Sequence, residues 1–239
     1  MSKATYHDIS TGLRLFTADD LVEGGSVAGT AAQAHYLGSV MRRAVGDPVR
    51  LFNGRDGEHA ACIATLRKDR LSFSTGTRLR PLLAEPDVWL VFAVLKRDAT
   101  DLVVQKATEL GVSAILPVFC ARTNAARVNV ERLCAIAMEA AEQSERLTVP
   151  LVHEPVDLFD LLGDWPAQRR LAAAIERSTA PGLAPGPGAL LVGPEGGFTP
   201  RELDLLGSAP FIEPVSLGGR VLRAETAAIA GLALMLARP

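Results

Sequence analysis

The stretch Ala-Leu-Leu-Val-Gly-Pro-Glu-Gly-Gly-Phe-Thr-Pro-Arg-Glu, residues 189–202, decides how the C-terminal half of the chain folds. The apolar run Ala189–Val192 has the length and bulk of a strand that is buried on both faces. A helix is expected after it, because Thr199 can be the N-cap, Pro200 suits the first helical position and Glu202 completes a capping box. Strand, loop and helix in this order form the arrangement in which α/β proteins bind ligands at the carboxyl ends of strands.

The glycine loop between this strand and this helix is not a phosphate loop. It carries an acid, Glu195, and lacks both the Gly-Lys-Ser/Thr ending of a P-loop and the glycine order of a dinucleotide fingerprint. Its glycines allow a ligand to approach the backbone closely, and the carboxylate favours a neutral or cationic ligand. A tight turn that only leads into a helix explains the same residues.

A second loop follows soon after. Phe211–Leu217 is predicted to be a strand, and Ala227–Ala237 to be an almost uncharged helix that is buried against a sheet or another subunit. Arg220, Arg223 and Glu225 crowd the entry to this apolar helix, where charges need partners.

Composition predicts an ordinary globular protein. The 239 residues are 48% hydrophobic and 22% charged, which suits one large domain or two modest ones. There is no apolar run of membrane-spanning length, and residues 1–10 are polar, so we expect neither a membrane span nor a signal peptide. We therefore expect the protein to be cytoplasmic. Cys62, Cys120 and Cys134 fit neither a disulfide framework nor a zinc site, so we expect reduced core thiols and no metal.

The net charge of −2 does not indicate a nucleic-acid partner, but the charged residues are distributed unevenly along the chain. Residues 1–80 hold 11 Lys and Arg against 8 Asp and Glu, whereas the remainder holds 14 against 19. The N-terminal part is therefore the better candidate for contact with phosphate.

The N-terminal part, residues 1–77, is predicted to be a small β-barrel. A capping box formed by Thr30 and Gln33 starts a helix over Ala31–Met41, and Asn53-Gly54 marks a hairpin turn. The expected strands are Leu13–Phe16, Pro48–Phe52, Glu58–Leu66 and Leu71–Ser74.

Residues 78–87 are predicted to be a linker, and residues 88–239 an α/β domain. Strands alternate there with helices, which predicts a parallel sheet with helices on both faces. The expected strands are Val88–Leu95, Ser113–Cys120 and Arg170–Ile175, besides the two above. The expected helices are Ala99–Leu110 with Asp98 as its cap and Gly111 as its stop, Val130–Arg146 with Asn129 as its cap, and Val156–Leu162.

Two motifs together resemble the C-terminal signature of the RsmE family. They are Leu-Val-Gly-Pro-Glu-Gly-Gly-Phe at 191–198 and Val-Ser-Leu-Gly-x-Arg-Val-Leu-Arg-x-Glu-Thr-Ala at 215–227. Residues 35–47, 105–112 and 139–146 also resemble segments of that family. Lys96-Arg97-Asp98-Ala99 departs from the usual Lys-Gly-Asp-Arg, and Leu133 stands where a Trp is common. Both departures concern the grip on RNA rather than the glycine loop.

The resemblance implies a SPOUT-class methyltransferase that transfers a methyl group from S-adenosylmethionine to N3 of a uridine in 16S ribosomal RNA. It also implies an N-terminal PUA-like barrel, a C-terminal trefoil knot and a homodimer. The cofactor would be held by Ile175, Glu176, Val192, Gly193, Pro194, Glu195, Gly196, Leu217, Gly218, Val221 and Leu222. The RNA would be held by Arg14, His35, Arg42, Arg43, Arg55, Lys96, Gln143 and Arg146.

The resemblance places Arg223 and Glu225 at the reaction. Arg223 would stabilise the negative charge that develops on uracil when its N3 proton leaves, and Glu225 would orient Arg223 or cap the last helix. A purely structural salt bridge between the two explains them as well. Two other functions remain open: a SPOUT enzyme that modifies another RNA position, and an RNA-binding assembly factor without catalysis.

Overall fold

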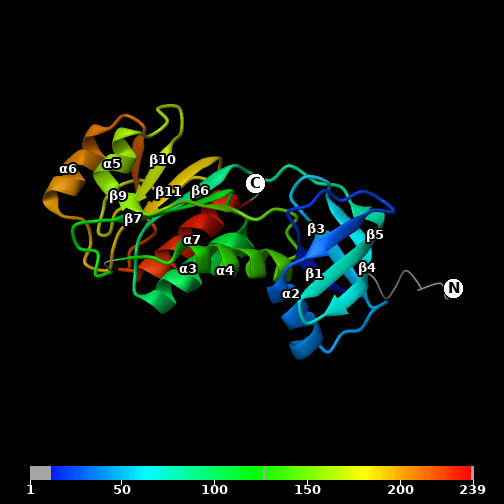
Figure 1. Cartoon of the computed structure of the whole chain (residues 1–239). Coiled ribbons are helices and arrows are strands. Elements are labelled where there is room, and N and C mark those ends of the chain that lie inside the picture. Colours follow the sequence, from blue (N-terminus) through cyan, green and yellow to red (C-terminus); the bar gives the residue numbers. More distant parts are fainter. Residues whose placement is uncertain (1–11, 126, 238–239) are drawn as a thin grey trace. The chain divides into compact units, whose positions relative to one another are not determined.

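The computed structural model describes residues 12–125 and 127–237, and the chain forms two compact units (Figure 1). Among the described residues, one unit contains residues 12–84 together with Ala141–Thr148, and the other contains residues 85–140 and 149–237. The return of Ala141–Thr148 to the first unit was not predicted from sequence. The polar segment 1–10 lies outside the described residues.

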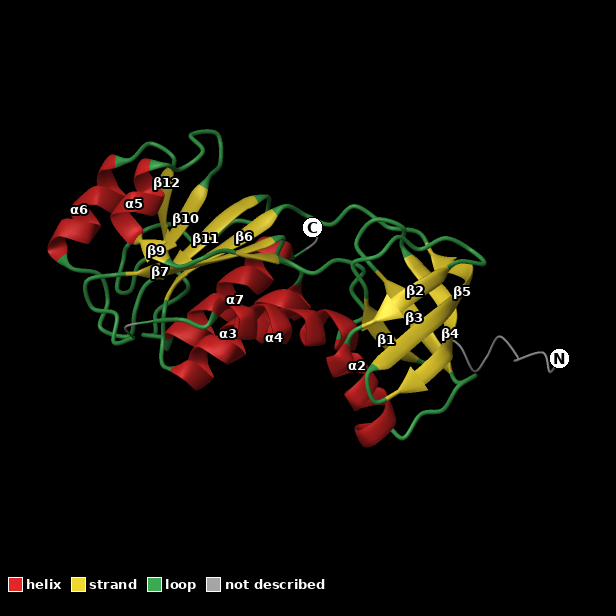
Figure 2. Ribbon diagram, in the orientation of Figure 1, coloured by secondary structure: helices red, strands yellow, loops and turns green. Residues whose placement is uncertain are grey.

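The first unit is built on a five-stranded sheet with the order β1-β3-β4-β5-β2 (Figure 2). Strand β1 pairs with β3 in parallel, and the other pairs are antiparallel. The core beneath it is formed by alternate strand side chains and by Leu37 from the helical segment. The strands are β1 (Leu13–Phe16), β2 (Ser26–Gly29), β3 (Pro48–Phe52), β4 (Glu58–Arg67) and β5 (Arg70–Arg80).

Two features of this sheet differ from the prediction. Strand β2 was missed, because it is short, lies between glycines and leaves Ser26 and Ala28 exposed. Strand β5 continues through Arg80, into residues that were assigned to the linker. The capping box of Thr30 and Gln33 is confirmed, but its α-helix, α2 (Ala31–His35), continues as a π-helical segment over Tyr36–Val40.

The second unit is built on a sheet with the order β12-β10-β11-β6-β7-β8, and β9 also pairs with β7. Every pairing is parallel, as predicted. The strands are β6 (Val88–Ala93), β7 (Ala114–Phe119), β8 (Leu151–Val152), β9 (Val156–Asp157), β10 (Leu171–Ala174), β11 (Gly188–Val192) and β12 (Ile212–Val215).

Helices cover both faces of this sheet (Figure 2). Leu90 and Phe92 face one core with α3, α4 and α7, whereas Val91 and Ala93 face the other with α5 and α6. The helices are α3 (Arg97–Leu110), α4 (Val130–Gln143), α5 (Leu158–Gly163), α6 (Pro200–Ser208) and α7 (Ala224–Leu236). Within the described ranges, no helix combines the length and the apolar character that crossing a bilayer requires.

Several predicted helix ends are correct and others are wrong. The capping box of Thr199 and Glu202, the cap by Asn129 and the left-handed stop at Gly111 are confirmed. Asp98 is not a cap, because α3 begins at Arg97 and Asp98 lies in its first turn, where an acid suits the helix dipole. The predicted helix Val156–Leu162 begins instead as strand β9, whose last residue, Asp157, caps α5.

Candidate functional site

A pocket of about 520 Å³ lies at the carboxyl ends of three neighbouring strands of the second unit. Its walls come from the loops that follow β10, β11 and β12, and from the turn that follows β7. This is the edge at which parallel sheets bind ligands, and the volume lies in the range of about 300–1,000 Å³ that is usual for small-molecule sites.

The structure brings together all of the residues that the sequence proposed for cofactor binding, and Arg223 with them. They line the pocket as Ile175, Glu176, Val192, Gly193, Pro194, Glu195, Gly196, Leu217, Gly218, Val221 and Leu222. Glu225 is not part of the lining.

The glycines of the loop after β11 are required by its shape. A Cβ atom on Gly193 would lie 2.8 Å from Cε2 and Cζ of Phe198, so a side chain there would displace that ring. Gly197 has φ +68° and donates its backbone N–H to the carbonyl of Pro194 at 2.8 Å. The loop is therefore a tight turn whose backbone passes close to its own side chains and to the pocket.

The start of α6 anchors the other end of this loop. The carboxylate of Glu202 is buried and accepts the backbone N–H of Thr199 at 2.6 Å and its hydroxyl at 2.8 Å. Burial by itself raises the pKa of Glu202, but the hydrogen bonds from Thr199 and Ala121 and the nearby charge of Arg122 lower it below its usual value. Glu202 therefore stays ionised at neutral pH and holds the start of α6 in place.

The pocket carries more positive than negative side chains. Arg122, Arg177, Arg220 and Arg223 line it, against the exposed carboxylates of Glu176 and Glu195. Arg122, Arg177 and Arg220 were not among the predicted site residues. Arg122 lies two residues after the end of the predicted strand Ser113–Cys120, so the rule that ligands bind at the carboxyl ends of parallel strands could have found it.

The expected pairing of Arg223 with Glu225 is wrong. In the described structure no hydrogen bond or ion pair joins them: Arg223 is exposed at the pocket as the N-cap residue of α7, and Glu225 lies in the first turn. Oε2 of Glu225 is buried and has no hydrogen-bond partner among the described residues. Glu225 therefore neither orients Arg223 nor caps α7 with a side-chain hydrogen bond here.

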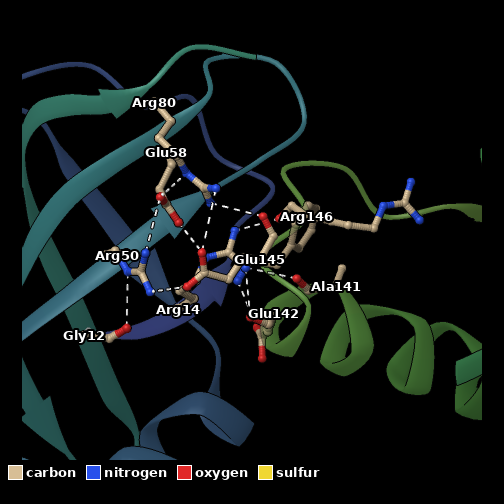
Figure 3. A network of polar contacts seen from close by, with 10 residues as sticks. Gly12, Arg14, Arg50, Glu58, Arg80, Ala141, Glu142, Glu145 and Arg146 are labelled. Atoms are coloured by element: carbon tan, nitrogen blue, oxygen red, sulfur yellow. Dashed lines mark hydrogen bonds and ion pairs between the residues drawn. The ribbon is translucent and has the colours of Figure 1, made fainter. Parts of the chain in front are cut away.

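Arg14 was expected to contact RNA, and this prediction is wrong because the side chain is buried inside the first unit (Figure 3). Its Nε donates to Oε1 of Glu58 at 2.5 Å, and Cζ of its planar guanidinium group lies 4.4 Å from the centre of the Phe52 ring. Its remaining nitrogens donate to the carbonyls of Ala141 at 3.0 Å, Glu142 at 2.8 Å and Arg146 at 2.6 Å. Arg14 thus satisfies two carbonyls in the last turn of α4, those of Ala141 and Glu142, and one carbonyl beyond the helix.

The other candidates for RNA contact differ in their exposure. Arg146 is buried and donates to the hydroxyl of Thr148 at 2.8 Å, so its side chain is not accessible to RNA at the surface. Arg43 is half-buried. Arg55 is exposed and pairs with Asp20 at 2.7 Å. The remaining candidates are exposed, namely His35, Arg42, Lys96 and Gln143.

The three cysteines are unpaired, and their burial differs from the expectation. Cys120 is buried, and burial raises its pKa to about 12; Cys62 is half-buried, whereas Cys134 is exposed on α4. Across residues 12–125 and 127–237, no cluster of three His, Cys, Asp or Glu side chains has the geometry of a metal site.

Comparison with known proteins gives one consistent family. The RNA methyltransferase domain family matches residues 83–236, and the RNA methyltransferase PUA domain family matches residues 30–75. A ribosomal RNA small subunit methyltransferase E of Rickettsia conorii is 37% identical over 205 residues, which cover 83% of this chain and 84% of that protein.

Solved structures agree with this result. A ribosomal RNA small subunit methyltransferase E from Neisseria gonorrhoeae, bound to S-adenosyl methionine, is 28% identical and matches with a TM-score of 0.82 over 93% of this chain and 95% of that one. A Legionella pneumophila protein in complex with the bound cofactor SAM, also 28% identical, matches with a TM-score of 0.84 over 93% and 96%. With its PUA unit, its parallel sheet and its glycine-loop pocket, the chain belongs to the RNA methyltransferase family that includes the small subunit methyltransferases E.

Proposed function

We propose that this chain is an S-adenosylmethionine-dependent ribosomal RNA methyltransferase, and that its target atom is N3 of a uridine in the small-subunit RNA. The observation that carries the proposal is the pocket, in which the two glycine-bearing loops meet at the ends of β11 and β12. A relative that is 37% identical and a solved structure with a TM-score of 0.82 are both named ribosomal RNA small subunit methyltransferase E, and the solved structure is bound to S-adenosyl methionine.

The pocket fits this methyl donor in size and chemistry. Apolar side chains of Ile175, Val192, Leu217 and Leu222 offer surface for its adenine ring, and the loop backbones offer hydrogen-bonding groups. The donor supplies a methyl group on a positively charged sulfur. The carboxylates of Glu176 and Glu195 attract this positive charge, and the four arginines of the lining, which outnumber them, can attract the carboxylate of the same donor.

Arg223 is the residue that we assign to the reaction. Uracil N3 becomes a useful nucleophile only when its proton leaves, because the lone pair of the neutral imide is delocalised. A guanidinium beside the uracil oxygens stabilises the negative charge that develops, and Arg223 is exposed in the pocket without an ion-pair partner among the described residues. The pocket orients the two reactants, which is the other large contribution to such a displacement.

The RNA must present the uridine outside a duplex, because N3 is used in base pairing. The exposed side chains of His35, Arg42 and Arg55 in the first unit, and of Lys96 in the second, support contact with the flanking backbone.

The proposal includes three further features: a trefoil knot, a cytoplasmic location and a homodimer. The support for the homodimer is that α7 is almost uncharged along its whole length, with Leu234 44% exposed.

The function is tested by mapping the modifications of ribosomal RNA from a strain that lacks the gene. We expect one methyl group to be missing from a uridine of the small-subunit RNA, and the purified protein to restore it with S-adenosylmethionine. Assays on free RNA and on small subunits show which is the substrate. If the missing methyl group belongs to a ribose or to another base, the proposed target atom is wrong. If no methyl group is missing, the proposed methyltransferase function is wrong.

Gly193→Ala is expected to weaken S-adenosylmethionine binding by about tenfold or more, because its Cβ would lie 2.8 Å from the ring of Phe198 and push the loop out of place. Titration calorimetry measures the loss. Gly207→Ala on α6, where a Cβ meets no atom within 4 Å, is the matched control and should bind normally. Normal binding by Gly193→Ala would show that the loop tolerates the displaced ring.

A further inference from the structure

The turn that follows β7 contacts the glycine loop although about seventy residues separate them in the chain. Residues Cys120–Thr123 close this turn with two hydrogen bonds: the N–H of Cys120 donates to the hydroxyl of Thr123 at 2.9 Å, and the N–H of Thr123 donates to the carbonyl of Cys120 at 3.0 Å. The turn starts at the end of a buried strand, so its position is defined by the sheet.

The first contact joins this turn to the start of α6. The N–H of Ala121 donates to Oε1 of Glu202 at 2.8 Å, while Oε2 of the same carboxylate holds Thr199. Glu202 is 1% exposed, so this bridge is protected from water. The capping box of α6 therefore also fixes the distance between the turn and the end of the glycine loop.

The second contact is made by Arg122 at the middle of the glycine loop. Its Nη1 donates to the carbonyl of Gly196 at 2.8 Å and makes a longer contact of 3.5 Å with the carbonyl of Phe198. The stem of the side chain lies flat on the loop, since a Cβ on Gly196 would be 3.3 Å from Cβ and Cδ of Arg122. Arg122 is thus packed on the loop and hydrogen-bonded to it, and it lines the pocket at the same point.

We propose that Arg122 is a positioning residue that holds the glycine loop in the conformation that binds the methyl donor. This deepens the proposed function and rests on it. The charged guanidinium of Arg122 fixes the orientation of the peptide group whose carbonyl belongs to Gly196. That orientation sets which backbone groups of residues 193–197 face the pocket. Gly193, Gly196 and Gly197 allow the loop many alternative conformations. Without the contact to Arg122, binding of S-adenosylmethionine must also order the loop, and this lowers the affinity.

The test compares Arg122→Ala and Arg122→Lys with the wild type, using Arg201→Ala as the control. Arg201 is an exposed arginine of α6 that stacks on Phe159 and does not line the pocket. Three quantities are measured: hydrogen exchange of the loop amides without donor, the Kd for S-adenosylmethionine by calorimetry, and kcat at saturating donor and RNA.

We expect Arg122→Ala to speed exchange at the amides of residues 193 and 195–199 and to raise the Kd for S-adenosylmethionine about 10- to 100-fold, while kcat at saturation stays within about threefold. Arg122→Lys keeps a charged donor on a flexible stem, so it should recover part of the affinity. Arg201→Ala should match the wild type in all three quantities.

The proposal is overturned if Arg122→Ala leaves loop exchange and Kd unchanged. It is also overturned if kcat falls as much as affinity, which would make Arg122 a residue of the reaction instead. If the wild type binds no S-adenosylmethionine but Arg122→Ala still loosens the loop, the proposed function fails while the loop contact stands. If the wild type binds the donor and the variant loop exchanges normally, only the role of Arg122 fails.

Discussion

Arg223→Ala is expected to lower kcat about 100- to 1,000-fold while the Kd for S-adenosylmethionine changes by no more than about threefold. The reason is that Arg223 is exposed in the pocket as the N-cap residue of α7, and its side chain makes no hydrogen bond or ion pair with the residues that the structure describes. A cation that matters only when charge develops on uracil contributes to the transition state and not to ground-state binding of the donor.

Single-turnover methylation of small-subunit RNA and donor calorimetry give the two quantities separately. Arg223→Lys keeps the charge but loses the planar fork, so it should retain part of the activity. Arg220→Ala removes a neighbouring arginine of the same pocket and tests whether general positive charge is enough. Equal losses of turnover and donor affinity in Arg223→Ala would show a structural role instead.

Glu58→Gln is expected to lower the free energy of unfolding of the first unit by about 3–5 kcal/mol, as is typical when one partner of a buried ion pair is removed. The Glu58 side chain is 1% exposed and accepts from Arg14 at 2.5 Å and Arg80 at 2.7 Å, with Arg50 at 3.7 Å (Figure 3). Without the carboxylate charge, the buried guanidinium group of Arg14 loses its ion-pair partner among the described residues, whereas Arg50 keeps its ion pair with Glu145 at 3.1 Å.

Urea unfolding of the full chain measures this effect, and Asp20→Asn is the matched control. Asp20 pairs with Arg55 at 2.7 Å, but both side chains are exposed, so the change should cost less than about 1 kcal/mol. A Glu58→Gln protein as stable as the control variant would show that the buried cluster is neutral for stability and that its hydrogen bonds to α4 suffice.

The same cluster makes the stability depend on pH. Burial raises the pKa of Glu58, but the hydrogen bonds from Arg80 and Arg14 outweigh it and hold the pKa below its ordinary value of 4.5. A carboxyl group whose pKa is depressed in the fold stabilises the protein above its unfolded pKa, and this contribution is lost as the pH falls through the folded pKa. The stability difference between wild type and Glu58→Gln should therefore be constant near neutral pH and shrink below about pH 4.5.

Arg14 shows why sequence reasoning misplaces some functional residues. In the sequence it is an arginine on a short strand of a slightly basic region, which suits phosphate contact. Its acceptors are Glu58 and the carbonyls of Ala141, Glu142 and Arg146, up to 132 residues away. No local pattern reveals such partners, so the same charge that predicts a surface contact also allows a buried one.

Arg122 is the opposite case, because it was not predicted to be a site residue but lines the pocket. It lies in a turn without a motif of its own, and its acceptor, the carbonyl of Gly196, is 74 residues away. Similarly, Arg223 and Glu225 are close in sequence, but Glu225 lies in the first turn of α7 and outside the pocket lining while Arg223 faces the pocket. Proximity in sequence is not proximity of side chains, because the helix start sends neighbouring residues in different directions.

By itself the sequence determined the features whose causes are local: the capping boxes at Thr30 and Thr199, the stop at Gly111, the alternation of strands and helices, and the two glycine loops. Each depends on residues a few positions apart, so propensity, capping and spacing are enough to predict it. Only the tertiary structure decided that Ala141–Thr148 joins the first unit, that Arg14 is buried against Glu58, and that Arg122 supports the pocket loop. Those features depend on which distant backbone groups meet once the sheets are packed, and a buried charge is stable only where that packing supplies its partners.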